Sequence, residues 1–264
     1  MNLSSNMRQL TQGKVEKLFL KVRHGQATVA LAPGDPLKCS AGLGLEGDVH
    51  ANRLSPRQIL ITLQSELDAL SIGAGALHEN MVISTNSPED FQPGAALVTS
   101  GGVEIKLTMY CEPCKRILGV VPDLRAMIRR RGILGYIVTG GEIRSGDSME
   151  LIPGRYAALP ESVTQKFLDF IPTIPSGQVV RFVDVTTAMG VDSSFVRAVP
   201  GYIRRSIGRN LPLHRIVNAR GELPDFVPDQ ATRLAAEGVR VETDGDVLKS
   251  GRAKIDLQRY LWRG

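Results

Sequence analysis

The sequence predicts two domains, a β-rich barrel followed by an α+β domain with a helix-turn-helix of winged-helix type. Before residue 153, short apolar or alternating runs are punctuated by Gly, Pro, Asn and Asp, which is typical of a barrel or sandwich. The stretch IPGRYAALPES (152–162) has the composition of a linker, and helical spacing of apolar residues follows it. We therefore expect domains at 1–153 and 163–264, joined by a linker at 154–162.

Composition places the chain among globular proteins. Of its 264 residues, 42% are apolar and 22% are charged. No apolar run is long enough to span a bilayer, and the first residues lack the apolar core of a signal peptide, so we expect a cytoplasmic protein with no membrane partner. Three cysteines do not suggest a disulfide framework. The formal net charge of +5 permits nucleic-acid binding without requiring it.

The first domain is expected to consist of short strands and two helices. Apolar or alternating runs predict strands at 17–22, 27–32, 58–63, 79–84, 95–100, 103–110 and 147–152. Helical spacing predicts helices at 65–72 and 123–131. Many short strands with few helices favour a barrel or a sandwich.

The second domain is expected to combine helices with a small strand pair. Helices are predicted at 161–171, 181–190, 197–207 and 229–239, and the strand pair at 239–251. Val163, Phe167 and Phe170 share one face of the first helix. Gly190 stops the second helix, and Pro200 falls in the first turn of the third, where its missing N–H is tolerated. Two short helices joined by a tight turn, the second of them basic, form a helix-turn-helix pattern.

Positive charge is concentrated in the second domain. Residues 191–220 include six arginines and a single acid, Asp192. Arg204 and Arg205 project from the second helix of the helix-turn-helix, and Arg197 stands at its start. Arginines placed in this way can pair with phosphates or reach into a groove of DNA. A solvated basic face is the alternative interpretation.

Four motifs in a fixed order carry a family resemblance over residues 165–245. They are IPSGQVVRF (174–182), VRAV (196–199), PLHRIV (212–217) and RLAAEGV (233–239). Together they resemble the DNA-binding domain of the alkylguanine-DNA alkyltransferases, whose motif is Pro-Cys-His-Arg-Val. In that family the cysteine takes an alkyl group from a guanine that has been flipped out of the duplex. In this chain Leu213 stands in the place of the cysteine.

The resemblance implies roles for individual residues. Arg197 matches the arginine that fills the gap left by the extruded base, and Phe182 matches a tyrosine that helps to rotate the nucleotide. His214 and Glu237 match the relay that would activate the cysteine. The implied DNA-binding residues are Arg197, Phe182, Arg204, Arg205 and Asn210, and the implied lesion pocket consists of Leu213, His214, Arg215 and Glu237.

Leu213 excludes alkyl transfer, because transfer needs a thiolate and no cysteine follows residue 114. The domain therefore resembles the alkyltransferase-like proteins, which bind alkylated DNA and flag it for other repair machinery. Duplex DNA with an alkylated guanine, together with repair proteins, is the implied set of partners. A degenerate domain that serves only packing is the alternative.

A Cys-x-x-Cys pair, Cys111 and Cys114, lies in the first domain. Taken alone, it is ambiguous among zinc binding, redox chemistry and coincidence. We expect no zinc, because the other candidate ligands are scattered singly along the chain; they are Cys39, His24, His50 and His78.

A second resemblance covers about 130 residues around this pair. The segments GLEGDVHANRLSPRQILIT (44–62), HENMVIS (78–84), FQPGAALVTSGGVEIKLT (91–108) and CEPCKRI (111–117) resemble the MOSC domain, which is named after the C-terminal part of molybdenum-cofactor sulfurase. The resemblance implies a β-rich barrel with catalytic activity that binds molybdenum cofactor or pyridoxal phosphate, or carries sulfur. Cys114, which follows a proline, matches the functional cysteine and is the implied thiolate ligand for the metal.

The basic side chains Lys115 and Arg116 flank Cys114 and are expected to lower its pKa. Cys111 is either a resolving thiol or a buried neighbour. The candidates for binding the cofactor phosphate are His50, Arg53 and Arg57, with ordinary surface and turn positions as the alternative. Asp48, Glu79 and Asn80 are expected to shape the barrel.

Two functions from different classes follow. The first is recognition of alkylated DNA by base flipping without transfer, coupled to a MOSC domain that binds molybdenum cofactor or carries sulfur on Cys114. The second is a MOSC-type molybdenum enzyme or sulfur carrier whose C-terminal domain is a vestigial scaffold. Binding to alkylated duplexes distinguishes the two.

Overall fold

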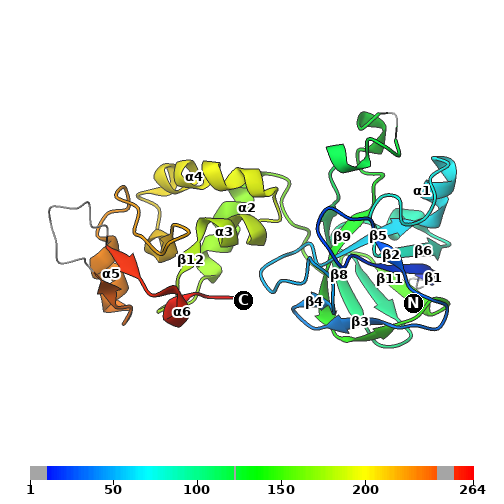
Figure 1. Cartoon of the computed structure of the whole chain (residues 1–264), viewed down its shortest axis with the longest axis horizontal. Coiled ribbons are helices and arrows are strands. Elements are labelled where there is room, and N and C mark those ends of the chain that lie inside the picture. The colour runs from blue at the N-terminus through cyan, green and yellow to red at the C-terminus, as the bar shows by residue number, and fades with distance from the viewer. Residues whose placement is uncertain (1–10, 122, 243–252) are drawn as a thin grey trace, which may run out of the picture. The chain divides into compact units, whose positions relative to one another are not determined.

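The computed structural model describes residues 11–121, 123–242 and 253–264 (Figure 1). The chain divides into two compact units between Leu159 and Pro160. No helix in the described ranges is both long enough and apolar enough to cross a membrane.

A closed barrel forms the N-terminal unit, as the sequence predicts. Its strands are β1 (Thr11–Leu20), β5 (Ile59–Leu63), β6 (Met81–Thr85), β7 (Ala96–Thr99), β8 (Glu104–Tyr110), β9 (Ile133–Thr139) and β11 (Ser148–Ile152). They are hydrogen-bonded in the order β11-β7-β8-β9-β5-β6-β1, and β1 closes the ring by pairing with β11. Only the β5–β6 pair within this ring is parallel.

Smaller elements surround the barrel. Strand β2 (Val29–Ala30) pairs with the end of β1, and β3 (Leu37–Ser40) lies between β4 (Gly44–Leu45) and β10 (Gly141–Ile143). The helix α1 (Gln64–Ala69) follows β5, and the short 3-10 turns are η1 (Pro88–Asp90), η2 (Lys115–Ile117) and η3 (Arg125–Met127). The strand expected at 27–32 is therefore reduced to two residues.

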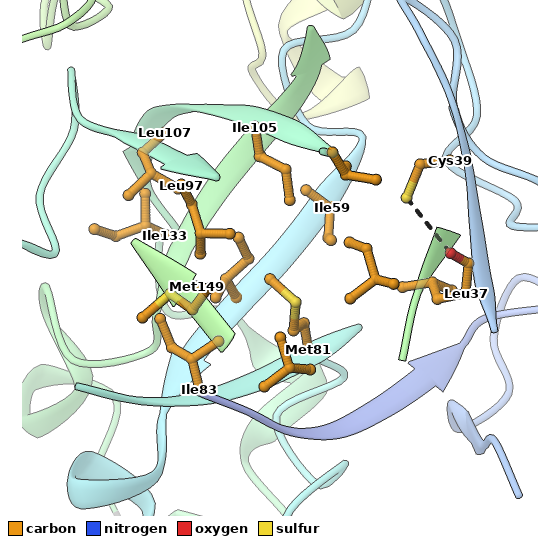
Figure 2. Close-up of a cluster of buried hydrophobic side chains, with 14 of the residues drawn as sticks. Leu37, Cys39, Ile59, Met81, Ile83, Leu97, Ile105, Leu107, Ile133 and Met149 are labelled. Atoms are coloured by element: carbon orange, nitrogen blue, oxygen red, sulfur yellow. Dashed lines mark hydrogen bonds between the residues drawn. The ribbon is translucent and has the colours of Figure 1, made fainter. Parts of the chain in front are cut away.

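Aliphatic side chains from opposite walls fill the barrel (Figure 2). Strand β11 alternates exposed and buried residues, whereas every residue of β5 is buried, as expected for a strand covered on both faces. Cys39 belongs to this core, and its Sγ lies 3.7 Å from the carbonyl oxygen of Leu37. Burial raises the pKa of the Cys39 thiol to about 12, so this cysteine is an inert core residue.

The prediction of a helix at 123–131 is wrong. Only the turn η3 is helical there, because Ile128 has extended geometry (ψ 122°) and Arg129 adopts a left-handed φ of 61°. The chain then enters β9 through Gly132, whose φ is 111° and whose missing Cβ would lie 2.3 Å from the carbonyl oxygen of Ile61. This reversal places Arg131 inside the unit, which a continuous helix would not do.

The C-terminal unit is α+β. Its helices and turns are α2 (Val163–Phe170), η4 (Ile171–Thr173), α3 (Phe182–Ala188), η5 (Ser193–Ala198), α4 (Val199–Ser206), η6 (Leu213–Arg215), α5 (Gln230–Ala236) and α6 (Leu257–Tyr260). Ser162 caps α2 by accepting a hydrogen bond from the backbone N–H of Gln165. Phe167 is fully buried, and Val163 and Phe170 pack against the same core, as the helical spacing predicts.

The helix-turn-helix is present with one adjustment. Gly190, at φ 64°, ends the α3 region, and α4 has Pro200 in its first turn. The start of the expected helix 197–207 is a 3-10 turn, so Arg197 belongs to η5 and the α-helix begins at Val199.

Two strand pairs complete the unit. Strands β12 (Val180–Arg181) and β13 (Ile216–Val217) are parallel, which brings the segment after the PLHR motif beside the start of α3. Strands β14 (Val241–Glu242) and β15 (Lys254–Ile255) are antiparallel. The second strand expected within 239–251 lies outside the described residues, whose gap spans 243–252.

Candidate functional site

The PLHR motif forms a tight turn between a loop and a strand. Leu213–Arg215 is one turn of 3-10 helix, and β13 begins at the next residue. The Gln230 side chain fixes this turn, because its Nε2 donates to the carbonyl oxygens of His214 (3.0 Å) and Ile216 (2.9 Å). Both Leu213 and His214 are buried, so their positions are determined by packing as well as by hydrogen bonds.

The Glu237 carboxylate, at the end of α5, gathers three groups that are distant in sequence. Its Oε1 lies 2.7 Å from His214 Nε2. Arg215 donates from Nη2 to Oε1 at 2.7 Å and from Nε to Oε2 at 3.0 Å, and the backbone N–H of Gly177 donates to Oε2 at 3.0 Å. We call this arrangement the Glu237 frame. Within it, His214 and Glu237, the implied relay pair, are in hydrogen-bond contact.

The frame sets the charge of both relay residues. Burial alone would raise the pKa of Glu237, but the hydrogen bonds from Arg215, His214 and Gly177 outweigh it and lower the pKa to about 2. Burial lowers the pKa of His214, against the hydrogen bond to Glu237, which raises it. The imidazole is therefore neutral at physiological pH. Its Nδ1 is buried and has no hydrogen-bond partner among the described residues.

Leu213 lies in the lining of a surface pocket, which we call the Leu213 pocket. The other lining residues are Ile207, Gly208, Arg209, Asn210, Leu211, Val227, Pro228, Asp229 and Arg233. Of the residues implied by the sequence, the structure brings Leu213 and Asn210 together here, whereas His214, Arg215 and Glu237 do not line the pocket. Sequence reasoning missed Arg233 and Arg209. Arg209 lies in the arginine-rich run before the motif, which was the available signal.

The arginines of the helix-turn-helix reach solvent. Arg197 is exposed on η5. Arg204 and Arg205 are exposed on α4, and their guanidinium carbons stack at 4.0 Å over the Phe226 ring and at 4.8 Å over the Tyr202 ring. Stacking holds the planar groups in place and leaves their charge available. Phe182 opens α3 with a half-buried ring packed against the core.

A second pocket lies in the barrel unit, and the buried Arg131 is one of the residues that line it. Its lining consists of Lys21, His50, Arg57, Leu60, His78, Asn80, Cys111, Arg116, Arg131 and Leu134. We call it the Arg131 pocket. Of the expected cofactor-binding residues, His50 and Arg57 line it, whereas Arg53 does not and has its Nη1 near Gly42 instead. Sequence reasoning missed Lys21 and Arg131, since nothing in their neighbourhood marks them as buried.

Arg131 links this pocket to Cys114. Its Nη1 donates to Cys114 Sγ at 3.2 Å and to the carbonyl oxygen of Glu112 at 2.7 Å. Burial opposes ionisation of Cys114, but the Arg116 backbone N–H and the Arg131 guanidinium outweigh it, so the pKa of this thiol is lowered. Burial raises the pKa of Cys111. Of the two, Cys114 is therefore the thiol poised for chemistry.

Acidic and amide groups near the pocket mainly serve the fold. Asp48 accepts hydrogen bonds from the Lys21 backbone N–H and from Asn80 Nδ2, and its Oδ1 lies 2.9 Å from His50 Nδ1. The buried Glu79 carboxylate accepts from the backbone N–H groups of Leu77 and Gly75. No group of three or more potential metal ligands occurs among the residues the structure describes.

Comparisons with known proteins agree with both units. A family model for the 6-O-methylguanine DNA methyltransferase, DNA binding domain, matches residues 162–239, and a MOSC domain model matches residues 47–150. A relative from Escherichia coli (strain K12), named DNA base-flipping protein, is 37% identical over 106 residues, which are 39% of this chain and 75% of the relative.

Two solved structures show similarity to part of the chain. The YUAD protein from Bacillus subtilis has a TM-score of 0.47 and 19% identity, covering 54% of this chain and 97% of that one. S. pombe Atl1 in complex with damaged DNA containing O6-carboxymethylguanine has a TM-score of 0.35 and 25% identity, covering 39% and 95%.

The fold, the motifs and the family matches define a MOSC domain joined to an alkyltransferase-like DNA-binding domain. The chain belongs to the family of the 6-O-methylguanine DNA methyltransferase DNA-binding domain, with Leu213 where the motif has its cysteine.

Proposed function

We propose that the C-terminal unit recognises alkylated guanine in duplex DNA by flipping the base, without transferring the alkyl group. The observation that carries the proposal is the placement of Leu213, which lines a surface pocket at the nucleophile's position while the Glu237 frame remains complete around the adjacent residues. An aliphatic side chain cannot attack carbon, so what remains is a binding site.

In this proposal, each step of recognition has a candidate residue in the chain. Arg204 and Arg205 contact phosphates from α4, and Arg197 enters the duplex to fill the gap that the extruded base leaves. The base enters the Leu213 pocket, whose lining is partly apolar. Extrusion costs a few kcal/mol and costs least at a damaged pair, so the pocket selects lesions without chemistry. On this proposal the protein works in the cytoplasm, with repair proteins reading the complex.

Titration against duplexes with and without an O6-alkylated guanine, at one stated salt concentration, tests the proposal. We expect tighter binding to the alkylated duplex. Equal binding to both, or binding to neither, removes the lesion-recognition function and leaves the C-terminal unit as a scaffold.

A second function is supported by the Arg131 pocket. We propose that the barrel unit carries sulfur on Cys114 or binds molybdenum cofactor there, as the MOSC match suggests. The residues suit such a group. Arg131 Nε and His78 Nδ1, both in pocket-lining residues, are buried with no partner in the described part of the chain, and the Cys114 thiol has a lowered pKa. A cofactor phosphate would satisfy such donors, and a thiolate is a ligand that molybdenum accepts.

In this proposal Cys114 supplies the thiolate, while Arg57, Arg116 and Arg131 hold an anionic group. The bound cofactor would supply oxygen- or electron-transfer chemistry. Lys21 is buried beside these cations, and its pKa is lowered by burial and by the charge of Arg116. Copurified molybdenum and sulfane sulfur, measured in wild type and in Cys114→Ser, test the proposal. We expect one of the two in the wild type and its loss in the variant.

A further inference from the structure

Excess positive charge occurs in the barrel unit as well as in the helix-turn-helix. Residues 115–131 hold six Lys and Arg residues against one acid, Asp123. Residues 191–220 have the same balance, six arginines against Asp192. Because the whole chain has an excess of only five positive charges, the residues outside these two segments are net acidic. Each unit therefore has one segment with the charge balance of a phosphate-binding surface.

Four of the cations in the barrel segment are exposed, and we call them the basic rim: Lys115, Arg116, Arg125 and Arg129. No carboxylate in the described ranges pairs with the side chains of the first three. Arg129 stacks over the Tyr110 ring at 5.4 Å. By contrast, Arg130 is neutralised by Glu66 at 2.8 Å, and Arg131 is buried. Lys115, Arg116 and Arg125 thus present positive charge that no carboxylate of the described residues neutralises.

Apolar side chains lie among these cations. Leu118, Val120 and Ile128 are 51%, 41% and 60% exposed. They belong to the green segment that stands out from the barrel strands near α1 (Figure 1). Apolar side chains in DNA-binding proteins contact sugars and base faces while neighbouring Lys and Arg residues take the phosphates. The combination therefore fits a nucleic-acid strand better than it fits a small hydrated anion.

We propose that the basic rim is a second DNA-contacting surface, so that the barrel unit adds phosphate contacts to a duplex held by the C-terminal unit. The proposal rests on the proposed function, because DNA bound by the C-terminal unit keeps the barrel unit close to the same duplex. Once one unit is bound, the other experiences a high effective concentration of the same DNA, so a weak surface is sufficient. Linked weak contacts raise overall affinity without a new high-affinity site.

The salt dependence of binding measures these contacts directly. The full-length chain is titrated with an unmodified duplex over a series of salt concentrations. For Lys115→Ala with Arg125→Ala, we expect the slope of log Kobs against log salt to lose about 1.8 in magnitude, since each phosphate contact contributes about 0.9. The matched control is Lys14→Ala with Lys38→Ala, which removes the same charge from exposed strand positions of the same unit and should leave the slope unchanged.

Each outcome decides a separate point. An unchanged slope in the rim variant, or an equal loss in both variants, overturns the rim as a specific surface. If the rim variant keeps its DNA slope but loses binding to vesicles of anionic phospholipid, the rim faces a membrane and the proposal is also overturned. If the protein shows no preference for alkylated guanine but the rim variant still has the reduced salt slope, the proposed function is contradicted. The proposal for the basic rim is supported in that case.

Discussion

Glu237 Oε1 lies 2.7 Å from His214 Nε2, although 23 residues separate the two along the chain. The same carboxylate accepts hydrogen bonds from Arg215 and from the Gly177 backbone N–H. One part-buried charge therefore ties α5, the PLHR turn and the segment before β12 together, with the guanidinium as its counter-charge. The arrangement stabilises the unit and also fixes the wall in which Leu213 lies.

Glu237→Gln should destabilise the C-terminal unit in a pH-dependent way. Loss of one partner of this part-buried, charge-assisted set of hydrogen bonds costs about 2 kcal/mol. The folded-state pKa of Glu237, about 2, lies below its ordinary value of 4.5, so the stabilisation is present above about pH 4.5 and is lost as the pH falls towards 2. Urea unfolding from pH 7 downward should show the wild type and the variant converging. The exposed Glu242→Gln is the control, and it should track the wild type throughout.

Leu213→Cys should gain alkyl transfer. The sulfur would form a bond to the alkyl carbon while the carbon–O6 bond breaks and guanine leaves. Neutral His214, with its free Nδ1 and its Nε2 held by Glu237, is suited to accept the thiol proton. Mass spectrometry after incubation with O6-methylguanine DNA should show one added methyl group. Leu213→Ser is the control and should stay unmodified. Binding without transfer by the cysteine variant would show that the Glu237 frame does not activate a thiol.

Arg197→Ala should weaken binding to an alkylated duplex more than binding to an unmodified one. An exposed arginine that fills the gap in the duplex acts only when a base is extruded, so about tenfold in affinity, or about 1.4 kcal/mol, should be lost on the lesion. Paired titrations at fixed salt provide the measurement. Arg204→Ala serves as the comparison, because a phosphate contact should be lost equally on both duplexes. A parallel loss for Arg197→Ala would reduce its role to that of a phosphate contact.

Arg131→Met should raise the pKa of Cys114. The guanidinium donates to Sγ at 3.2 Å, and its loss removes both the hydrogen bond and the charge that favour the thiolate. The pH profile of iodoacetamide alkylation at Cys114, followed by peptide mass spectrometry, should shift upward. Arg125→Met changes charge at an exposed position nearby and should leave the profile in place. Cys39 and Cys111 should remain unreactive in the folded chain, because both are buried.

Much of the fold could be predicted because the spacing of apolar residues along the chain indicates which side chains are buried. Strand β11 alternates between buried and more exposed residues, and the α2 face of Val163 and Phe167 follows helical spacing. Prediction failed at Arg129–Arg131, three consecutive arginines with different surroundings. Arg129 stacks on Tyr110, Arg130 pairs with Glu66, and Arg131 is buried against Cys114. Local sequence favours a helix there, and only tertiary contacts distinguish the three side chains.

The candidate sites were predictable where a motif orders its residues. His214, Arg215 and Glu237 are in contact, as the order of the alkyltransferase-like motifs implies. The PLHR turn leads into β13, which pairs with β12, and Glu237 lies at the end of α5. The Arg131 pocket was only partly predictable. Lys21 comes from the end of β1 and Arg131 from the approach to β9, so their proximity arises from closure of the barrel.

Hydrogen bonds within the chain hold the side chains of the Glu237 frame in place. Side chains fixed in this way have little conformational entropy left to lose when a ligand binds. Most of the free-energy cost of forming the complex then arises in the duplex, whose base stacking must open, while the protein keeps its conformation. Discrimination between bases would consequently be determined by how easily each one leaves the helix.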